Sequence, residues 1–214
     1  MAQAIIALMS LILIIITSIA LLISSNWRWG IILISLQYIG VFLMVRIEWP
    51  TTLAAVKLVA GWMSGAILAL ALISLPDKPI AQTSLVEDSP KAEEQLKPSR
   101  NISLWVFQFL ASILVFVTAF SLAPIIKLWT PTTNFFVIWT GLILIGMGLL
   151  KLGIQEGPLP AILGLLTSLA GFEILYATIE TSILVAGLLA TVNLGLAMVG
   201  AYLLVAPTAP KESG

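Results

Sequence analysis

Long apolar stretches separated by short polar segments dominate the hydrophobic pattern of this chain. A helix needs about 20 mostly apolar residues to cross the hydrocarbon core of a bilayer. Seven stretches reach or approach that length, at 4–23, 29–45, 51–75, 102–122, 133–150, 158–178 and 182–205. The pattern therefore predicts an all-α integral membrane protein with seven transmembrane helices. Composition agrees, because charged residues make up 9% of the chain, whereas an ordinary soluble domain carries about 25%.

One polar segment divides the chain. Residues 76–101 hold four prolines and nine of the twenty charged residues, a composition typical of a solvated linker. The expected organisation is a three-helix membrane half at 1–75, the linker at 76–101, a four-helix membrane half at 102–206 and a tail at 207–214. No internal repeat is evident in the sequence.

The positive charges predict an orientation, because cytoplasmic loops are enriched in Lys and Arg. If the seven spans alternate in direction, seven of these residues fall on one side and two on the other. The larger group is Arg28, Lys78, Lys91, Lys97, Arg100, Lys151 and Lys211, and the smaller group is Arg46 and Lys127. The linker and the C-terminus are therefore expected in the cytoplasm and the N-terminus outside.

Missing residue types exclude most chemistry. The chain has no cysteine and no histidine, and these residues supply most ligands for zinc, haem, copper and iron–sulfur clusters. We therefore expect no metal site and no cofactor. The acidic and basic residues balance at ten each, so no basic surface suggests nucleic acid, and no phosphate-binding loop or catalytic motif is found. No catalytic site is expected in this chain.

Two ionisable residues fall inside predicted spans, where a charge costs about 2.5–3.5 kcal/mol on insertion scales. Lys57 and Glu173 lie at similar depths below the same side of the membrane, so we expect them to face the bundle interior or a partner and to couple. They are candidates for an ion path. Each also has a structural interpretation, because Lys57 can extend to the headgroups and Glu173 can be held by helix contacts.

Two amides and several glycines mark further positions within the spans. Gln37 and Asn193 lie near the middle of their helices, where an amide can either bridge helices or line a hydrated ion path. Neither can carry a proton by titration. Small residues allow close helix approach in membrane bundles, and we expect that role for Gly141, Gly146, Gly148, Gly164, Gly171, Gly187, Gly195 and Gly200.

The helix arrangement and two segments resemble a known group of membrane proteins. Seven spans, a linker after the third span, and the segment Arg-Trp-Gly-Ile-Ile-Leu-Ile-Ser-Leu-Gln at 28–37 are similar to the component E subunit of hydrogenase-4-type membrane complexes. This resemblance extends to Lys57 and covers nearly the whole chain. The segments ending in Glu173 and Asn193 resemble the small three-helix subunit shared by complex I and multisubunit cation/proton antiporters. The resemblance implies a place in a membrane arm, beside large antiporter-like subunits.

The chain departs from that pattern at two positions. Leu169 occupies the place of the family's membrane glutamate, and Asn193 stands where an acidic residue is expected. Glu173 lies one turn beyond Leu169, on roughly the same helix face, and could replace the missing carboxylate.

Three functions remain after the sequence is read. The first is a non-catalytic subunit of an ion-translocating complex, with other membrane subunits as partners and the lipid bilayer as solvent. The second is an autonomous secondary transporter, although midplane binding groups and broken helices are not found. The third is a membrane scaffold or assembly factor without ion chemistry. The expected location is the cytoplasmic membrane of a prokaryote or a thylakoid membrane, and the sequence does not decide whether the parent complex is an oxidoreductase or an antiporter.

Overall fold

The computed structural model describes residues 2–24, 26–74 and 97–206, and this part of the chain forms seven α-helices. All seven contain a stretch long and apolar enough to cross a membrane. The predicted fold class, an all-helical protein with seven such helices, is therefore confirmed. The helices are α1 (Ala2–Ile23), α2 (Trp27–Glu48), α3 (Thr51–Ser74), α4 (Lys97–Trp129), α5 (Phe135–Ile154), α6 (Pro158–Ala177) and α7 (Ile183–Val205). Most of the predicted linker and the predicted tail lie outside the described residues.

The predicted boundaries are wrong mainly at α4. This helix begins at Lys97, inside the segment assigned to the linker, and ends at Trp129 instead of residue 122. Pro124 lies inside the helix, although a proline lacks the N–H of an intrahelical hydrogen bond and usually stops a helix. Here the proline lies in the second-last turn of α4, and the helix continues past it to Trp129.

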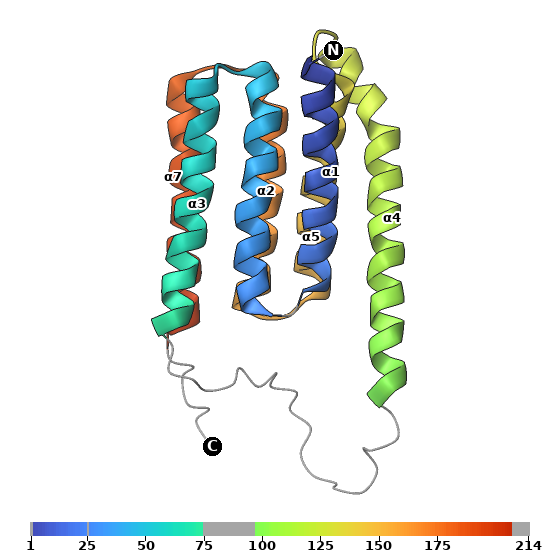
Figure 1. The fold of residues 1–214 in the computed structure, drawn as a ribbon, viewed down its shortest axis with the longest axis vertical. Helices are drawn as coiled ribbons and strands as arrows, with labels where there is room; N and C mark the ends of the chain where they lie inside the picture. The colour runs from blue at the N-terminus through green and yellow to red at the C-terminus, as the bar shows by residue number, and fades with distance from the viewer. Residues whose placement is uncertain (1, 25, 75–96, 207–214) are drawn as a thin grey trace, which may run out of the picture.

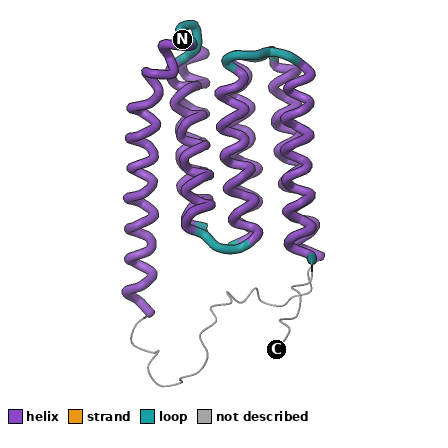
Figure 2. Tube along the Cα trace, turned by 180° about the vertical axis from the view of Figure 1, so that it is seen from behind, coloured by secondary structure: helices purple, strands orange, loops and turns teal. Residues whose placement is uncertain are grey.

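Six of the helices form two layers of three, and α4 lies at one edge (Figure 1). One layer contains α1, α2 and α3, and the other contains α5, α6 and α7. Across the layers, α1 contacts α5, α2 contacts α6 and α3 contacts α7, while α4 contacts α5 and α1. Figure 2 shows the same layers from behind. Helices are expected in lipid because they satisfy every backbone hydrogen bond internally.

Short turns with specific end groups join several of the helices. Asn26 and Asn134 cap α2 and α5, each accepting the backbone N–H two residues further on. Gly157 precedes α6 with a φ of 114°, a conformation that favours glycine, and Pro158 follows at the first helical position, which suits proline. The indole N–H of Trp49 donates to the Glu180 carbonyl at 3.0 Å, which ties the α2–α3 turn to the α6–α7 turn.

The second layer repeats the first at a nearly constant spacing in the sequence. α1 ends at residue 23 and α5 at residue 154, a difference of 131 residues. α2 begins at residue 27 and α6 at residue 158, which is the same difference. α3 begins at residue 51 and α7 at residue 183, a difference of 132 residues. Contacts repeat as well: a Cβ at Gly40 of α2 would meet Ile14 of α1, and a Cβ at Gly171 of α6 would meet Ile145 of α5. Paired helices run in the same direction (Figure 1). The structure thus contains a repeat that the sequence did not reveal.

Glycines bring α5 and α6 into close contact, as expected from the sequence. A Cβ at Gly171 would lie 2.6 Å from the Gly141 carbonyl oxygen, and one at Gly164 would lie 2.9 Å from that of Gly148. Gly146 and Gly200 also meet neighbouring side chains. Two of the eight do not have this role in the described part of the chain, because no atom of another helix lies within 4 Å of a Cβ at Gly187 or Gly195.

Candidate functional site

A buried ion pair joins the two layers. The Lys57 ammonium of α3 donates to Glu173 Oε1 of α6 at 2.8 Å, and both residues are about 1% exposed. The prediction that these two residues face the bundle interior and lie near enough to couple is therefore confirmed. A charge in a dry environment is tolerated only when an opposite charge and hydrogen bonds compensate it. This requirement explains why the lysine turns inward to the carboxylate and does not extend to the surface.

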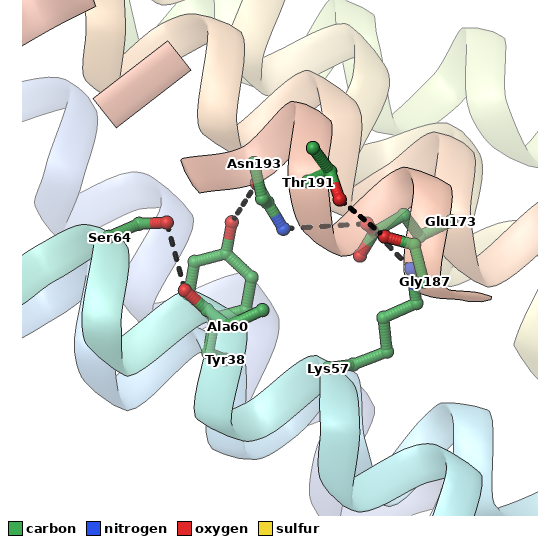
Figure 3. Close-up of polar contacts among 8 residues, drawn as sticks. All are labelled: Tyr38, Lys57, Ala60, Ser64, Glu173, Gly187, Thr191 and Asn193. Atoms are coloured by element: carbon green, nitrogen blue, oxygen red, sulfur yellow. Dashed lines mark hydrogen bonds and ion pairs between the residues drawn. The ribbon is translucent and has the colours of Figure 1, made fainter. Parts of the chain in front are cut away.

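Asn193 of α7 extends the pair into a network of four side chains (Figure 3). Its Nδ2 group donates to Glu173 Oε1 at 3.4 Å, and its Oδ1 atom accepts from the Tyr38 hydroxyl at 2.9 Å. Tyr38, Lys57, Glu173 and Asn193 come from α2, α3, α6 and α7, and all four are buried. Asn193 thus bridges helices, which was one of its two expected roles.

Tyr38 was missed in the sequence analysis. The sequence held one signal for it: a phenol near the middle of a long apolar span needs a hydrogen-bond partner, because its hydroxyl cannot reach water. Its aromatic ring also packs where α3 has Gly61, since a Cβ at that position would overlap the ring.

Gln37 is buried, but it does not join this network. Neither amide atom has a hydrogen-bond partner among the described residues. Gln37 lies seven residues after Gly30, hence on the same face of α2, and a Cβ at Gly30 would meet Leu163 of α6. Gln37 therefore faces the space between α2 and α6. Glu173 Oε2, on α6, likewise has no partner in the described part of the chain.

A second buried cation lies at the opposite end of the bundle. Lys151 of α5 is 2% exposed, and its ammonium donates at 2.7 Å to the Leu21 carbonyl of α1 and at 2.7 Å to Gln155 Oε1. Gln155 Nε2 in turn donates to the Leu22 carbonyl. The sequence analysis placed Lys151 just beyond its helix, among the loop charges. It lies instead inside α5, where its ammonium donates to the Leu21 carbonyl, which belongs to the last turn of α1 and has no partner within that helix.

The arrangement limits what chemistry the site can perform. Only Lys57 and Glu173 of the four-residue network change charge readily, while the amide and the phenol pass on hydrogen bonds. No group of three or more His, Cys, Asp or Glu residues that could hold a metal occurs among the described residues. The site can therefore hold or exchange a proton or bind a small cation at the carboxylate, and it can fix the two layers together.

No protein-family model matches this chain, and no curated protein and no solved structure is similar to it. The fold class is therefore assigned from the structure alone. The resemblance to membrane-arm subunits stays an expectation from short motifs.

Proposed function

We propose that this chain is a non-catalytic membrane-arm subunit of a multisubunit ion-translocating complex, and that Glu173 contributes to its proton or cation path. In this role the chain packs beside larger antiporter-like subunits, and its linker and C-terminus face the cytoplasm of a prokaryotic cell or the corresponding side of a thylakoid membrane.

One observation carries the proposal: a carboxylate is buried within the membrane-spanning bundle with one oxygen paired and the other free of hydrogen bonds to the described residues. Ionisable groups within transmembrane segments are expensive and usually serve ion pathways. The paired oxygen keeps Glu173 in place against Lys57 and Asn193. The other oxygen remains available to a proton, a cation or water.

A scaffold without ion chemistry is the second candidate. The observation that favours it is that the two buried charges already compensate each other. Lys57 and Glu173 neutralise each other, and Asn193 adds a further hydrogen bond. Such a network can hold the two layers together without titrating. An autonomous transporter gains less support, because α2, α3, α6 and α7 run unbroken through the site, whereas such transporters bind ions at interrupted helices.

The substitution Glu173→Gln separates the two candidates. The amide keeps the size of the side chain and still accepts from Lys57, but it cannot titrate. We expect ion pumping per assembled complex to fall by about a hundredfold or more, the usual contribution of a group that transfers protons. The amount of assembled complex should fall as well, because the Lys57 ammonium loses its counter-charge in a dry site. Pumping is measured as proton or cation uptake by inverted membrane vesicles and is normalised to assembled complex on native gels.

Glu180→Gln is the matched control, because this carboxylate lies exposed in the α6–α7 turn. Its replacement should change neither pumping nor assembly. If Glu173→Gln leaves pumping per complex unchanged, the ion-path role is rejected and the scaffold remains.

A further inference from the structure

Two buried side chains on facing helices carry polar atoms that no described residue satisfies. On α2, the Gln37 side chain is 1% exposed, and neither its amide oxygen nor its amide nitrogen has a partner among the described residues. On α6, Glu173 is equally buried, and its Oε2 atom also has no partner there. Buried polar groups in native proteins are almost always hydrogen-bonded, either to protein or to bound water. Two such groups in one helix interface therefore point to a ligand that satisfies both.

The register of α2 against α6 brings the two groups to neighbouring levels of the bundle. A Cβ at Gly30 of α2 would lie 3.0 Å from a methyl carbon of Leu163 of α6. The two helices run in the same direction (Figure 1), and seven residues further along each of them the same faces return. Gln37 therefore lies opposite Ala170. Glu173 follows Ala170 by three residues, about 4.5 Å along the helix axis.

Hydrogen bonds beside Gln37 support this placement. The next residue on α2, Tyr38, donates to Asn193 at 2.9 Å, and Asn193 donates to Glu173 Oε1 at 3.4 Å (Figure 3). One amide group thus spans the gap between this level of α2 and the carboxylate. Oε1 already accepts from Lys57 and Asn193, so Oε2 is the oxygen that is left for the Gln37 side of the interface.

Ala170 leaves the Gln37 carboxamide without a direct partner on α6. Its methyl group offers no hydrogen bond, and it is shorter than the Leu163 side chain that fills the interface two turns earlier. Side chains on a helix lean toward its N-terminus, so Glu173 leans from its own level toward that of Ala170. The carboxamide and Oε2 therefore lie on either side of the Ala170 methyl group.

We propose that water bound between α2 and α6 joins the Gln37 carboxamide to Glu173 Oε2. Water fits both ends, because the amide N–H donates to a water oxygen and a water O–H donates to a carboxylate. A buried water typically makes about three hydrogen bonds to groups that otherwise lack partners, and these two side chains supply such groups. Gln37 is then a positioning residue that holds water against the carboxylate. The inference rests on the proposed function only for the use of that water in an ion path.

A metal cation fits the same atoms less well. Carboxylate and amide oxygens are ligands for hard cations, but the Lys57 ammonium already compensates the Glu173 charge at 2.8 Å. A second cation would leave a net positive charge in a dry environment, which is costly. Water adds hydrogen bonds without adding charge, and it is therefore the ligand that the site favours.

Nuclear magnetic resonance of the full-length chain in lipid nanodiscs tests the proposal. The glutamate carboxyl carbons are isotope-labelled, and the Glu173 signal is the one that Glu173→Gln removes. In the unaltered chain, magnetisation from water should reach this signal at short mixing times. Gln37→Met keeps the length of the side chain but has no amide, so it should abolish this transfer. The labelled side-chain amide of Gln37 should receive the same transfer in the unaltered chain, a readout that needs no folded variant.

Gln108→Met is the matched control, because Gln108 lies on α4, which packs chiefly against α5 and α1. It should leave the transfer to Glu173 unchanged. Transfer that is missing in the unaltered chain, or that persists in Gln37→Met, would overturn the bound water. A Glu173 signal that moves when sodium replaces choline in the buffer would overturn it in favour of a cation. None of these outcomes depends on pumping, whereas the ion-path role fails if assembled Glu173→Gln complexes pump normally.

Discussion

At the scale of single residues, the ion pair illustrates which contacts a sequence reveals in a membrane. Lys57 and Glu173 could be predicted to meet, because each is costly alone in hydrocarbon and both lie at similar depth. Tyr38 could not be placed by the same reasoning, since an uncharged phenol costs less and tyrosine is also common at membrane surfaces. Its partner, Asn193, lies 155 residues away in the chain.

The ion pair makes a prediction about stability. Lys57→Met alone leaves the Glu173 carboxylate buried without its cation, and this should lower the free energy of unfolding by about 3–5 kcal/mol. Replacing both residues with methionine removes both charges and should cost less than either single change. Denaturation of the purified chain in detergent measures all three variants. A double variant whose loss equals the sum of the single losses would show that the two charges are not coupled.

At the scale of the helices, length and apolarity predicted all seven elements but not how they pair. Most of these helices are apolar on several faces, because lipid and the protein interior both accept apolar side chains, so periodicity does not identify a buried face. The glycines predicted helix contacts only in part. Gly141 and Gly171 lie at the contact between α5 and α6, whereas Gly187 and Gly195 contact no other helix in the described part of the chain.

The orientation of the Lys151 side chain is a second feature of the helices that the sequence does not predict. Near a helix end, a lysine that extends to the headgroups and one that turns inward to backbone carbonyls have the same sequence context. The structure shows the second case, in which α5 holds the last turn of α1.

Lys151→Met should therefore loosen the contact between α1 and α5. The change leaves the buried Leu21 carbonyl without its ammonium donor, and a buried unpaired group costs about 1–3 kcal/mol. Thermal unfolding should occur at a lower temperature, and amide hydrogen exchange should quicken in the last turn of α1. Lys127→Met, at an exposed position near the end of α4, is the control and should change neither quantity. Equal effects from the two variants would contradict the role of Lys151 in holding the last turn of α1 against α5.

At the scale of the whole molecule, the parallel repeat gives the bundle two unlike ends and two unlike faces. The α1–α2 and α5–α6 turns lie at one end, and the α2–α3, α4–α5 and α6–α7 turns lie at the other (Figure 1). The ion pair lies nearer the second end, since Glu173 falls in the last two turns of α6. Lys151 lies near the first end. The orientation in the membrane therefore decides from which side Glu173 is reached.

Labelling of single cysteines tests that orientation, and the chain provides a clean background because it has no cysteine. Glu156 and Thr181 are both exposed, in the α5–α6 and α6–α7 turns at opposite ends of the bundle. The excess of Lys and Arg at the α5–α6 end predicts that this end is cytoplasmic. In intact cells, an impermeant maleimide should therefore label Thr181→Cys and not Glu156→Cys. After the cells are opened, both variants should react, which controls for accessibility. Labelling of Glu156→Cys alone in intact cells would reverse the orientation and place the carboxylate nearer the cytoplasm.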